Sequence, residues 1–189
     1  MRLSKLGYYA DFFISLFLIV VSIGVATFDT RLNGAKWLLC VGLGAAAWTL
    51  IEYMIHRWIY HRVPYFRGLH EAHHAEPGAD IGAPPIIGVM LILTVFYAPA
   101  ATTSFVIASG LTTGVLAGYS TYMLVHHADH HWTPAPTSWL LRARRQHALH
   151  HHHSDLCNFG ITTSIWDRLF GTAGAIAQGA IHHGRAERL

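Results

Sequence analysis

Charged residues are scarce in this sequence. Of its 189 residues, Asp, Glu, Lys and Arg together make up 12%, whereas hydrophobic residues make up 52%. A soluble domain usually carries about 25% charged residues, because its surface must be hydrated. The shortage of charge therefore excludes an ordinary soluble domain and favours a small integral membrane protein.

Cysteine is also scarce, with Cys40 inside an apolar run and Cys157 in a polar segment. We do not expect the two to meet, so no disulfide framework is implied and a reducing compartment is acceptable. The formal net charge is +3, but Lys and Arg form short groups beside apolar runs and no continuous basic stripe. We therefore expect no nucleic-acid partner and attribute these charges to membrane topology.

Four apolar segments each approach the roughly 20 residues that a helix needs to cross a bilayer. They lie at about 8–27, 35–55, 85–101 and 103–125. The first has the look of a signal peptide, but its apolar core is long and no clear small-residue cleavage site follows, so we expect it to be retained. Short connections join the first segment to the second and the third to the fourth, which predicts an all-α integral membrane fold of two helical hairpins.

Basic residues are unevenly distributed about these segments. One end carries Arg31 and Lys36, and the other carries Arg2, Lys5, Arg57, Arg62, Arg67, Arg142, Arg144, Arg145, Arg168, Arg185 and Arg188. The positive-inside rule predicts that the second end is cytoplasmic. Both termini and all the histidines fall at that end. The expected location is the inner membrane of a bacterium or the endoplasmic reticulum of a eukaryote.

Histidine is abundant, with 16 in the chain. A pair, His56 and His61, precedes H-x-x-H-H at 70–74, and H-H-A-D-H-H at 126–131 precedes a second H-x-x-H-H at 147–151. On a helix, positions three and four apart share a face, so each H-x-x-H-H can direct three imidazoles into one space. The five-residue step between His56 and His61 predicts a wider spread, as two different metals or a helix end would require.

Converging neutral imidazoles have few uses besides metal binding, because histidine is the commonest nitrogen ligand and suits Fe, Zn, Cu and Ni. Two metals is the natural count. Spacing does not decide between His126 with His130 and His127 with His131. A single histidine at a membrane boundary is most often an interfacial polar residue, but four spaced clusters rarely arise by chance. His182 and His183 have no H-x-x-H-H around them, and we predict that they are not ligands.

The order of these motifs, followed by N-F-G-I-T-T-S-I-W-D-R-L-F-G-T at 158–172, resembles a known superfamily. This superfamily comprises the fatty acid hydroxylases and sterol desaturases, which are membrane di-iron enzymes. The resemblance covers about 52–172. E-Y-M-I-H-R-W-I-Y-H at 52–61, H-E-A-H-H at 70–74 and G-Y-S-T-Y-M-L-V-H at 118–126 are most similar to the fatty acid 2-hydroxylase branch. The last match selects His126 with His130.

The resemblance implies a single domain, 1–189, in which four transmembrane helices lie beneath a small cytoplasmic helical cap. The cap would comprise the histidine clusters at 56–82 and 126–172, followed by a loose tail at 173–189. A histidine-rich dimetal site is expected between the helices and the cap. The implied metal ligands are His56, His61, His70, His73, His74, His126, His130, His147, His150 and His151.

The implied cofactors are two iron ions, which zinc can replace on purification because nitrogen ligands bind zinc more tightly than ferrous iron. Dioxygen is the expected co-substrate. The chain has no heme-binding H-P-G-G motif, so we expect electrons from a separate b-type cytochrome, ferredoxin or reductase. The oligomeric state is not predicted.

Acidic residues near the histidines are candidates for orienting them, since a metal-bound histidine usually donates its other ring N–H to a carboxylate or carbonyl. Glu52, one turn before His56, is the strongest candidate. For Asp167, an ion pair with a nearby arginine is an equally good explanation. The full set is Glu52, Asp129, Asp155 and Asp167.

These features predict an oxygen-dependent lipid hydroxylase that attacks a C–H bond of a fatty acyl chain, with 2-hydroxylation as the expected outcome and the substrate entering from the bilayer. One alternative is a desaturase or hydroxylase of a sterol or carotenoid in the same superfamily. Another is a histidine-rich zinc or nickel transporter or sensor. Transport needs ionisable groups inside the spans, yet Asp11 and Glu52 are the only acids there, both near ends, which disfavours it.

Overall fold

The computed structural model describes residues 3–28, 33–82, 85–102, 104–133, 135 and 138–174. Within these ranges the chain is helical and forms no β-strand, which confirms the all-helical prediction. The long helices are α1 (Lys5–Thr27), α2 (Gly34–Met54) and α6 (Phe105–His131). A π-helical turn, η1 (Ile55–Tyr60), continues α2. The shorter elements are α3 (Pro64–Ala75), α4 (Pro85–Ile92), the π-helical η2 (Leu93–Tyr97), α5 (Ala98–Ala101), α7 (Trp139–His152) and α8 (Ile165–Leu169).

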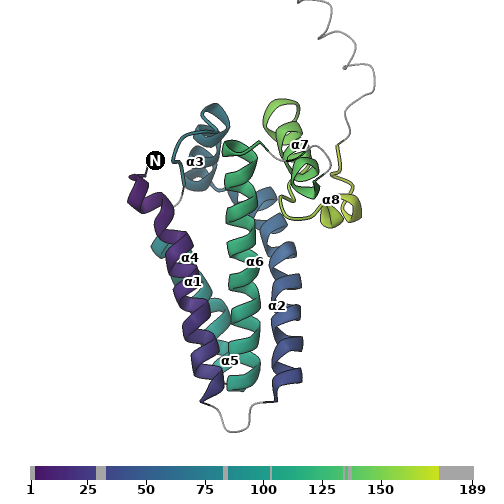
Figure 1. Cartoon of the computed structure of the whole chain (residues 1–189). Coiled ribbons are helices and arrows are strands. Elements are labelled where there is room, and N and C mark those ends of the chain that lie inside the picture. The colour runs from purple at the N-terminus through teal and green to yellow at the C-terminus, as the bar shows by residue number, and fades with distance from the viewer. Residues whose placement is uncertain are drawn as a thin grey trace, which may run out of the picture.

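The helices form a bundle with a cap at one end. In Figure 1, α1, α2, α6 and the segment from α4 to α5 run side by side, and α6 lies against both α1 and α2. The remaining helices, α3, α7 and α8, gather at the end of the bundle where the N-terminus also lies. All the described histidines belong to this end, since they lie on or just after η1, on α3, at the end of α6, or on or just after α7.

Local sequence explains where several helices begin. Ser4, Asn33 and Ser138 each accept a hydrogen bond from a backbone N–H three residues ahead, which caps α1, α2 and α7. Pro64 stands in the first turn of α3, where a missing backbone N–H costs nothing. Pro64 and Ser138 therefore mark where α3 and α7, the helices that carry the two H-x-x-H-H motifs, begin.

Glycines bring α2 and α6 into close contact. A Cβ at Gly44 would collide with the carbonyl oxygen of Leu111, and one at Gly114 would collide with the carbonyl oxygen of Val41. At Gly118 it would meet the Trp48 side chain at 2.6 Å. Such small-residue contacts are typical of helices that associate within a membrane. The close packing holds the histidine-bearing ends of the two helices against each other.

Two helical segments of the described chain are long and apolar enough to cross a membrane, Lys5–Thr27 and Gly34–Tyr60. Their outward faces are apolar: Phe13 and Phe17 on α1 are 68% and 66% exposed, and Leu38 on α2 is 64% exposed. The core helix of a soluble protein would bury such residues, so this pattern indicates association with a membrane.

The other two predicted spans have a different character. Residues 85–101 form three short consecutive elements, α4, η2 and α5, and residues 103–125 fall largely within α6, whose buried residues include many small and hydroxyl-bearing side chains. Membrane crossing by these two segments stays a prediction. Most of the short connection predicted between the first two segments, residues 29–32, lies outside the described residues. Gly174, in the predicted loose tail, exchanges hydrogen bonds with the Asn158 side chain, so this residue is not loose.

Candidate metal centre and apolar pocket

The π-helical turn places His56 and His61 together. In an α-helix, residues five apart point about 140° away from each other, given 3.6 residues per turn, and this geometry underlies the predicted wide spread. The π-turn has more residues per turn. It brings the two imidazole rings into a stacked arrangement with centroids 5.4 Å apart. The alternative of two different metals was therefore wrong, whereas the alternative of a helix end is confirmed, because η1 ends at Tyr60 and His61 follows it.

The histidines assemble into two groups of side chains that could each hold a metal ion, with the candidate ligand atoms in each within 4.8 Å of one another. We call the first the loop-held group, because two of its members bond to a loop. It consists of His56, His61, His70 and His150. We call the second the helix-held group, because all its members lie on α3, α6 and α7. It consists of His73, His126, His130, His147 and His151.

The spacing suggested that each H-x-x-H-H motif directs its imidazoles into a single space. The structure shows that it does not. On α3, His70 belongs to the loop-held group and His73 to the helix-held group. On α7, His150 belongs to the first and His147 to the second. His74 lies between the groups, with its Nε2 3.0 Å from that of His70 and its ring stacked on His151 at 4.0 Å. Each motif therefore spans both groups, because residues three apart on a helix are also offset along its axis.

Within the loop-held group, the ring nitrogens converge closely. The Nε2 atom of His56 lies 3.0 Å from that of His150 and 3.1 Å from that of His70. The Nε2 atoms of His61 and His70 are also 3.1 Å apart. In the helix-held group, the Nε2 pairs of His126 with His73 and of His130 with His147 are each separated by 3.1 Å. Two nitrogens bound about 2.1 Å from one metal ion would be about 3.0–3.4 Å apart, so these separations suit shared ligation.

The tautomers of two histidines strengthen this argument. His56 Nδ1 donates to the carbonyl oxygen of Phe159 at 2.6 Å, and His150 Nδ1 donates to that of Cys157 at 2.8 Å. A neutral imidazole that donates from Nδ1 has only a lone pair on Nε2. The Nε2 atoms of His56 and His150 therefore present two lone pairs to each other at 3.0 Å, an arrangement that a cation between them would stabilise. The residues fit a metal ion.

The environment keeps the histidines of the cap neutral. Burial, reinforced by the neighbouring histidines, lowers the pKa of His73 to about 3, of His130 to about 4 and of His151 to about 2. Burial likewise lowers the pKa of His150 to about 4, and the pKa values of His126 and His147 lie well below the ordinary range. Neutral imidazole is the form that binds metals.

The predicted carboxylates do not contact the histidine rings directly. Glu52 accepts hydrogen bonds from the backbone N–H groups of Ile161 and Thr162, at 2.6 and 2.9 Å, and from the Thr162 hydroxyl. Asp167 accepts from the backbone N–H groups of Phe159 and Gly160, each at 2.8 Å. Of the two kinds of acceptor expected, carboxylate or carbonyl, the rings of His56 and His150 use the carbonyl, at Phe159 and Cys157. The sequence did not indicate which carbonyls these are, although they lie in or beside the motif that begins at Asn158.

The other two candidate carboxylates differ from these. Among the described residues neither Asp129 oxygen has a hydrogen-bond partner, although Asp129 is buried, and burial raises its pKa to about 7. Asp155 lines a polar opening of about 550 Å³ beside His61 and His74. For Asp167, the alternative of an ion pair takes an indirect form. Arg57 donates to the Tyr53 hydroxyl, which contacts the Thr172 hydroxyl, and Thr172 donates to Asp167.

The remaining histidines belong to neither group or lie outside the described residues. His127 and His131 stack on each other at 4.3 Å, and His127 Nδ1 lies 3.1 Å from the Tyr8 hydroxyl of α1. His152 and His153 are exposed at the end of α7. His182 and His183 lie outside the described residues. The structure thus places His126 and His130 with the other candidate ligands.

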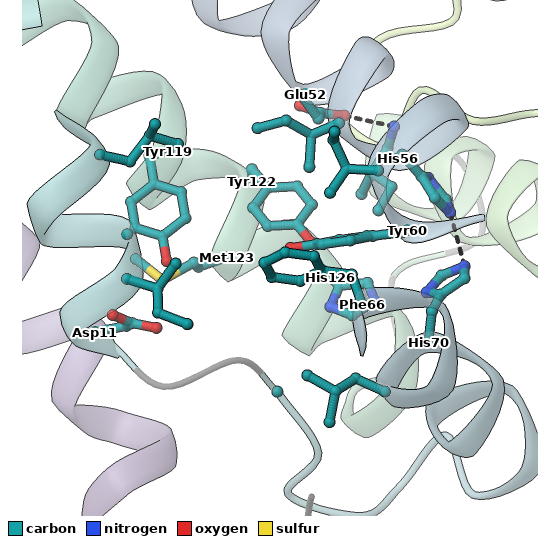
Figure 2. Close-up of a pocket in the computed structure, with 18 of the residues that line it drawn as sticks. Asp11, Glu52, His56, Tyr60, Phe66, His70, Tyr119, Tyr122, Met123 and His126 are labelled. Carbon is teal, nitrogen blue, oxygen red and sulfur yellow. Dashed lines mark hydrogen bonds between the residues drawn. The ribbon is translucent and has the colours of Figure 1, made fainter. Parts of the chain in front are cut away.

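An apolar pocket of about 460 Å³ adjoins both groups. His56 and His70 line it from one group, and His73 and His126 from the other. In Figure 2, Tyr60, Tyr122 and Phe66 lie beside these histidines, while Asp11 and Tyr119 face each other farther along the pocket. The walls come mainly from α1, α2, η1, α3, α4, η2 and α6, and are mostly aliphatic and aromatic. Such a cavity suits a hydrophobic ligand with its reacting part beside the histidines.

Comparisons with known proteins agree with this geometry. The fatty acid hydroxylase family model matches residues 41–172. The dihydroceramide fatty acyl 2-hydroxylase FAH2 of Arabidopsis thaliana is 30% identical over 151 residues, which are 75% of this chain and 63% of that protein. The human fatty acid 2-hydroxylase is 33% identical over 146 residues, which are 69% of this chain and 38% of that protein.

A solved structure is also similar. The structure described as full-length scs7p, in which only the hydroxylase domain is visible, superposes with a TM-score of 0.75 at 26% sequence identity. The superposition covers 89% of this chain and 67% of that one. The chain spans less than two thirds of the length of the curated relatives described above. Because the family model covers more than half of the sequence and includes every histidine of both groups, the chain belongs to the fatty acid hydroxylase family.

Proposed function

We propose that this protein is a membrane-bound, oxygen-dependent hydroxylase that inserts one oxygen atom into a C–H bond of a fatty acyl chain, at the carbon next to the carbonyl. The observation that carries the proposal is the apolar pocket whose wall includes histidines from both groups. The names of the relatives, which specify 2-hydroxylation of fatty acyl chains, support the position of attack.

The proposed metal centre contains two iron ions held by the ten predicted histidines. The loop-held and helix-held groups would provide nine of the ligands. His74, which lies between them, would provide the tenth. When bound, the iron pair supplies the reduction of dioxygen to an oxidant strong enough for an aliphatic C–H bond. Zinc would occupy the same nitrogen ligands on purification.

The reaction needs electrons from outside the chain. One oxygen atom of dioxygen enters the C–H bond, and two electrons and two protons reduce the other to water. We propose a separate b-type cytochrome, ferredoxin or reductase as the donor. The polar opening beside His61, His70 and His74 lies on the side of the cap where a soluble donor could approach. This opening is distinct in composition from the apolar pocket, which keeps water away from the reacting carbon.

The acyl chain would enter from the bilayer, because the pocket walls belong to the helices of the bundle. We propose that all four segments cross the membrane and that the cap is cytoplasmic, as the distribution of arginines predicts.

Asp11 and Tyr119 are the polar side chains farthest along the pocket in Figure 2. Holding the polar head of the lipid at the interface would place the carbons near its carbonyl beside the histidines.

The test is to supply membranes containing the protein with labelled dioxygen, a reducing system and a mixed lipid pool, and to locate the label by mass spectrometry. The proposal expects label on the 2-carbon of acyl chains. Label confined to a sterol or carotenoid, or a new double bond without retained oxygen, would refute acyl hydroxylation and leave the metal centre standing.

A pocket variant makes the test specific. Gly88→Leu adds a side chain that begins 3.6 Å from the Tyr119 hydroxyl, inside the pocket. It should raise KM for long acyl chains and leave metal content unchanged. Gly42→Leu is the matched control, because a Cβ at the exposed Gly42 of α2 meets nothing within 4 Å.

A further inference from the structure

A short loop supports one histidine group and leaves the other without such support. This segment, Cys157–Thr162, which we call the carbonyl loop, lies between α7 and α8. Its carbonyl groups at Cys157 and Phe159 accept the Nδ1–H groups of His150 and His56. These bonds fix the tautomer of both rings, so that each presents the lone pair of Nε2 to the centre of the loop-held group.

The loop has little freedom to move. Asn158 has a positive φ of 55°, a conformation that asparagine tolerates better than most residues. Gly160 has no room for a side chain, since a Cβ there would collide with the carbonyl oxygen of Thr163 and approach Asp167 Oδ2 to 2.9 Å. Asn158, Phe159 and Ile161 are almost fully buried. The carbonyl groups are therefore held in fixed directions.

Two buried carboxylates hold this loop, one from a helix that precedes it in the sequence and one from the helix that follows it. Glu52 lies on α2 one turn before His56 and bonds to Ile161 and Thr162. Asp167 lies on α8 and bonds to Phe159 and Gly160. Their side chains are 3% and 1% exposed. Each accepts hydrogen bonds from two backbone N–H groups and one threonine hydroxyl. Because buried polar groups need partners, the loop cannot move away without leaving these groups unpaired.

The helix-held group has no equivalent support among the described residues. His147 Nδ1 and both ring nitrogens of His151 lack hydrogen-bond partners there, as do both oxygens of the nearby Asp129. Its rings are directed by helix register and by packing, as in the stacking of Tyr122 on His126 at 5.7 Å and the T-shaped contact of His147 with His151 at 4.4 Å. Binding a metal in this group requires ordering the rings of His147 and His151, which no acceptor among the described residues orients in advance.

We propose that the two metal positions are unequal: the loop-held group binds its ion more tightly and fills first, and Glu52 and Asp167 are positioning residues that act on it through the carbonyl loop. This inference rests on the proposed dinuclear centre. Its physical basis is preorganisation, because acceptors that orient ligand histidines typically change metal affinity by about 10- to 100-fold.

The experiment is a titration of the purified full chain, in nanodiscs and after removal of metal, with Co²⁺ alone, followed by its visible absorption and by calorimetry. Wild type should bind two ions in two resolved steps separated by about 10-fold or more. His61→Ala should remove the tighter step and His130→Ala the weaker one. Glu52→Gln and Asp167→Asn should weaken only the tighter step, by about 10- to 100-fold, and Thr162→Val, which removes one hydroxyl donor to Glu52, should weaken it less.

The outcomes separate this inference from the proposed function. Two ions bound with equal affinity, or equal loss of both steps in Glu52→Gln and Asp167→Asn, would overturn the inequality while the dinuclear centre stands. Fewer than two ions on wild type would overturn the dinuclear centre itself. Because these variants could also unfold the cap, circular dichroism and the unchanged weaker step provide the check on folding, and His127→Ala, which alters a histidine outside both groups, should leave both steps unchanged.

Discussion

The two histidine groups contain the same residue type at similar burial, yet they are held by different means. In the loop-held group, His56 and His150 donate to the backbone carbonyls of Phe159 and Cys157. These carbonyls are close to His150 in the sequence but about a hundred residues from His56. In the helix-held group, the rings are placed by the register of α3, α6 and α7. The difference shows that identical H-x-x-H-H motifs can provide ligands to two sites with unequal support, because each motif is divided between the sites.

The largest expected effect comes from removing one ligand of either group. His150→Ala and His147→Ala should each reduce hydroxylation by more than the roughly 100-fold typical of losing an outer hydrogen bond to a ligand. The proposed dinuclear centre uses both groups, so the two losses should look alike in turnover. Metal analysis should separate them, with the tighter ion lost in the first variant and the weaker in the second. Full activity in either variant would exclude that residue from the centre.

A smaller effect is expected from Gly160→Ala, which should act on the loop-held group alone. The new Cβ would displace the carbonyl loop, at a cost of about 1–3 kcal/mol in the free energy of unfolding. The tighter metal step should weaken while the weaker step stays unchanged. Gly68→Ala on α3 is the matched control, because a Cβ there meets nothing within 4 Å. If both variants behave alike, the tight packing around Gly160 has no bearing on the metal.

The pH dependence of stability should be shared by both groups, because burial acts on each. In the metal-free protein the pKa of His73 is lowered to about 3 and that of His150 to about 4. Below the ordinary pKa of about 6.5 the unfolded chain binds protons that the folded chain does not. Stability should therefore fall as pH drops from about 6.5 towards 4, by at most about 1.4 kcal/mol per pH unit for each residue.

The check is thermal unfolding of the metal-free protein in detergent at a series of pH values. His73→Asn and His150→Asn should each reduce the slope by a similar amount, because both side chains are buried. A flat profile between about pH 6.5 and 5 would contradict the assignment of both as neutral buried histidines.

The smallest expected effect concerns Asp129, which adjoins the helix-held group. Its buried oxygens have no partner among the described residues, and burial raises its pKa to about 7. Asp129→Asn should therefore raise the free energy of unfolding of the metal-free protein slightly, by up to about 1 kcal/mol. Asp167→Asn should lower it, since Asp167 has three hydrogen-bond donors. Equal destabilisation by the two substitutions, measured by thermal unfolding, would mean that Asp129 has a partner in solution.

Much of this protein could be predicted from its sequence because the signals are local. Apolar runs predicted the helical bundle, and capping residues such as Ser4 and Asn33 mark helix starts that the structure retains. Histidine spacing predicted metal ligands on the cap, and resemblance selected His126 over its neighbour His127. Spacing alone could not do so, because adjacent positions on a helix differ only in which neighbour they face.

By itself, the sequence determined that the chain is helical, that its apolar helices associate with a membrane and that histidines gather at one end, since composition and periodicity act within a single segment. Only the tertiary structure decided how those histidines divide into two groups. The π-turn at Ile55–Tyr60 changes the direction of His61, and Glu52 meets a loop more than a hundred residues away. These outcomes depend on packing between distant segments and on backbone carbonyls, which every residue carries and which therefore leave no mark in the sequence.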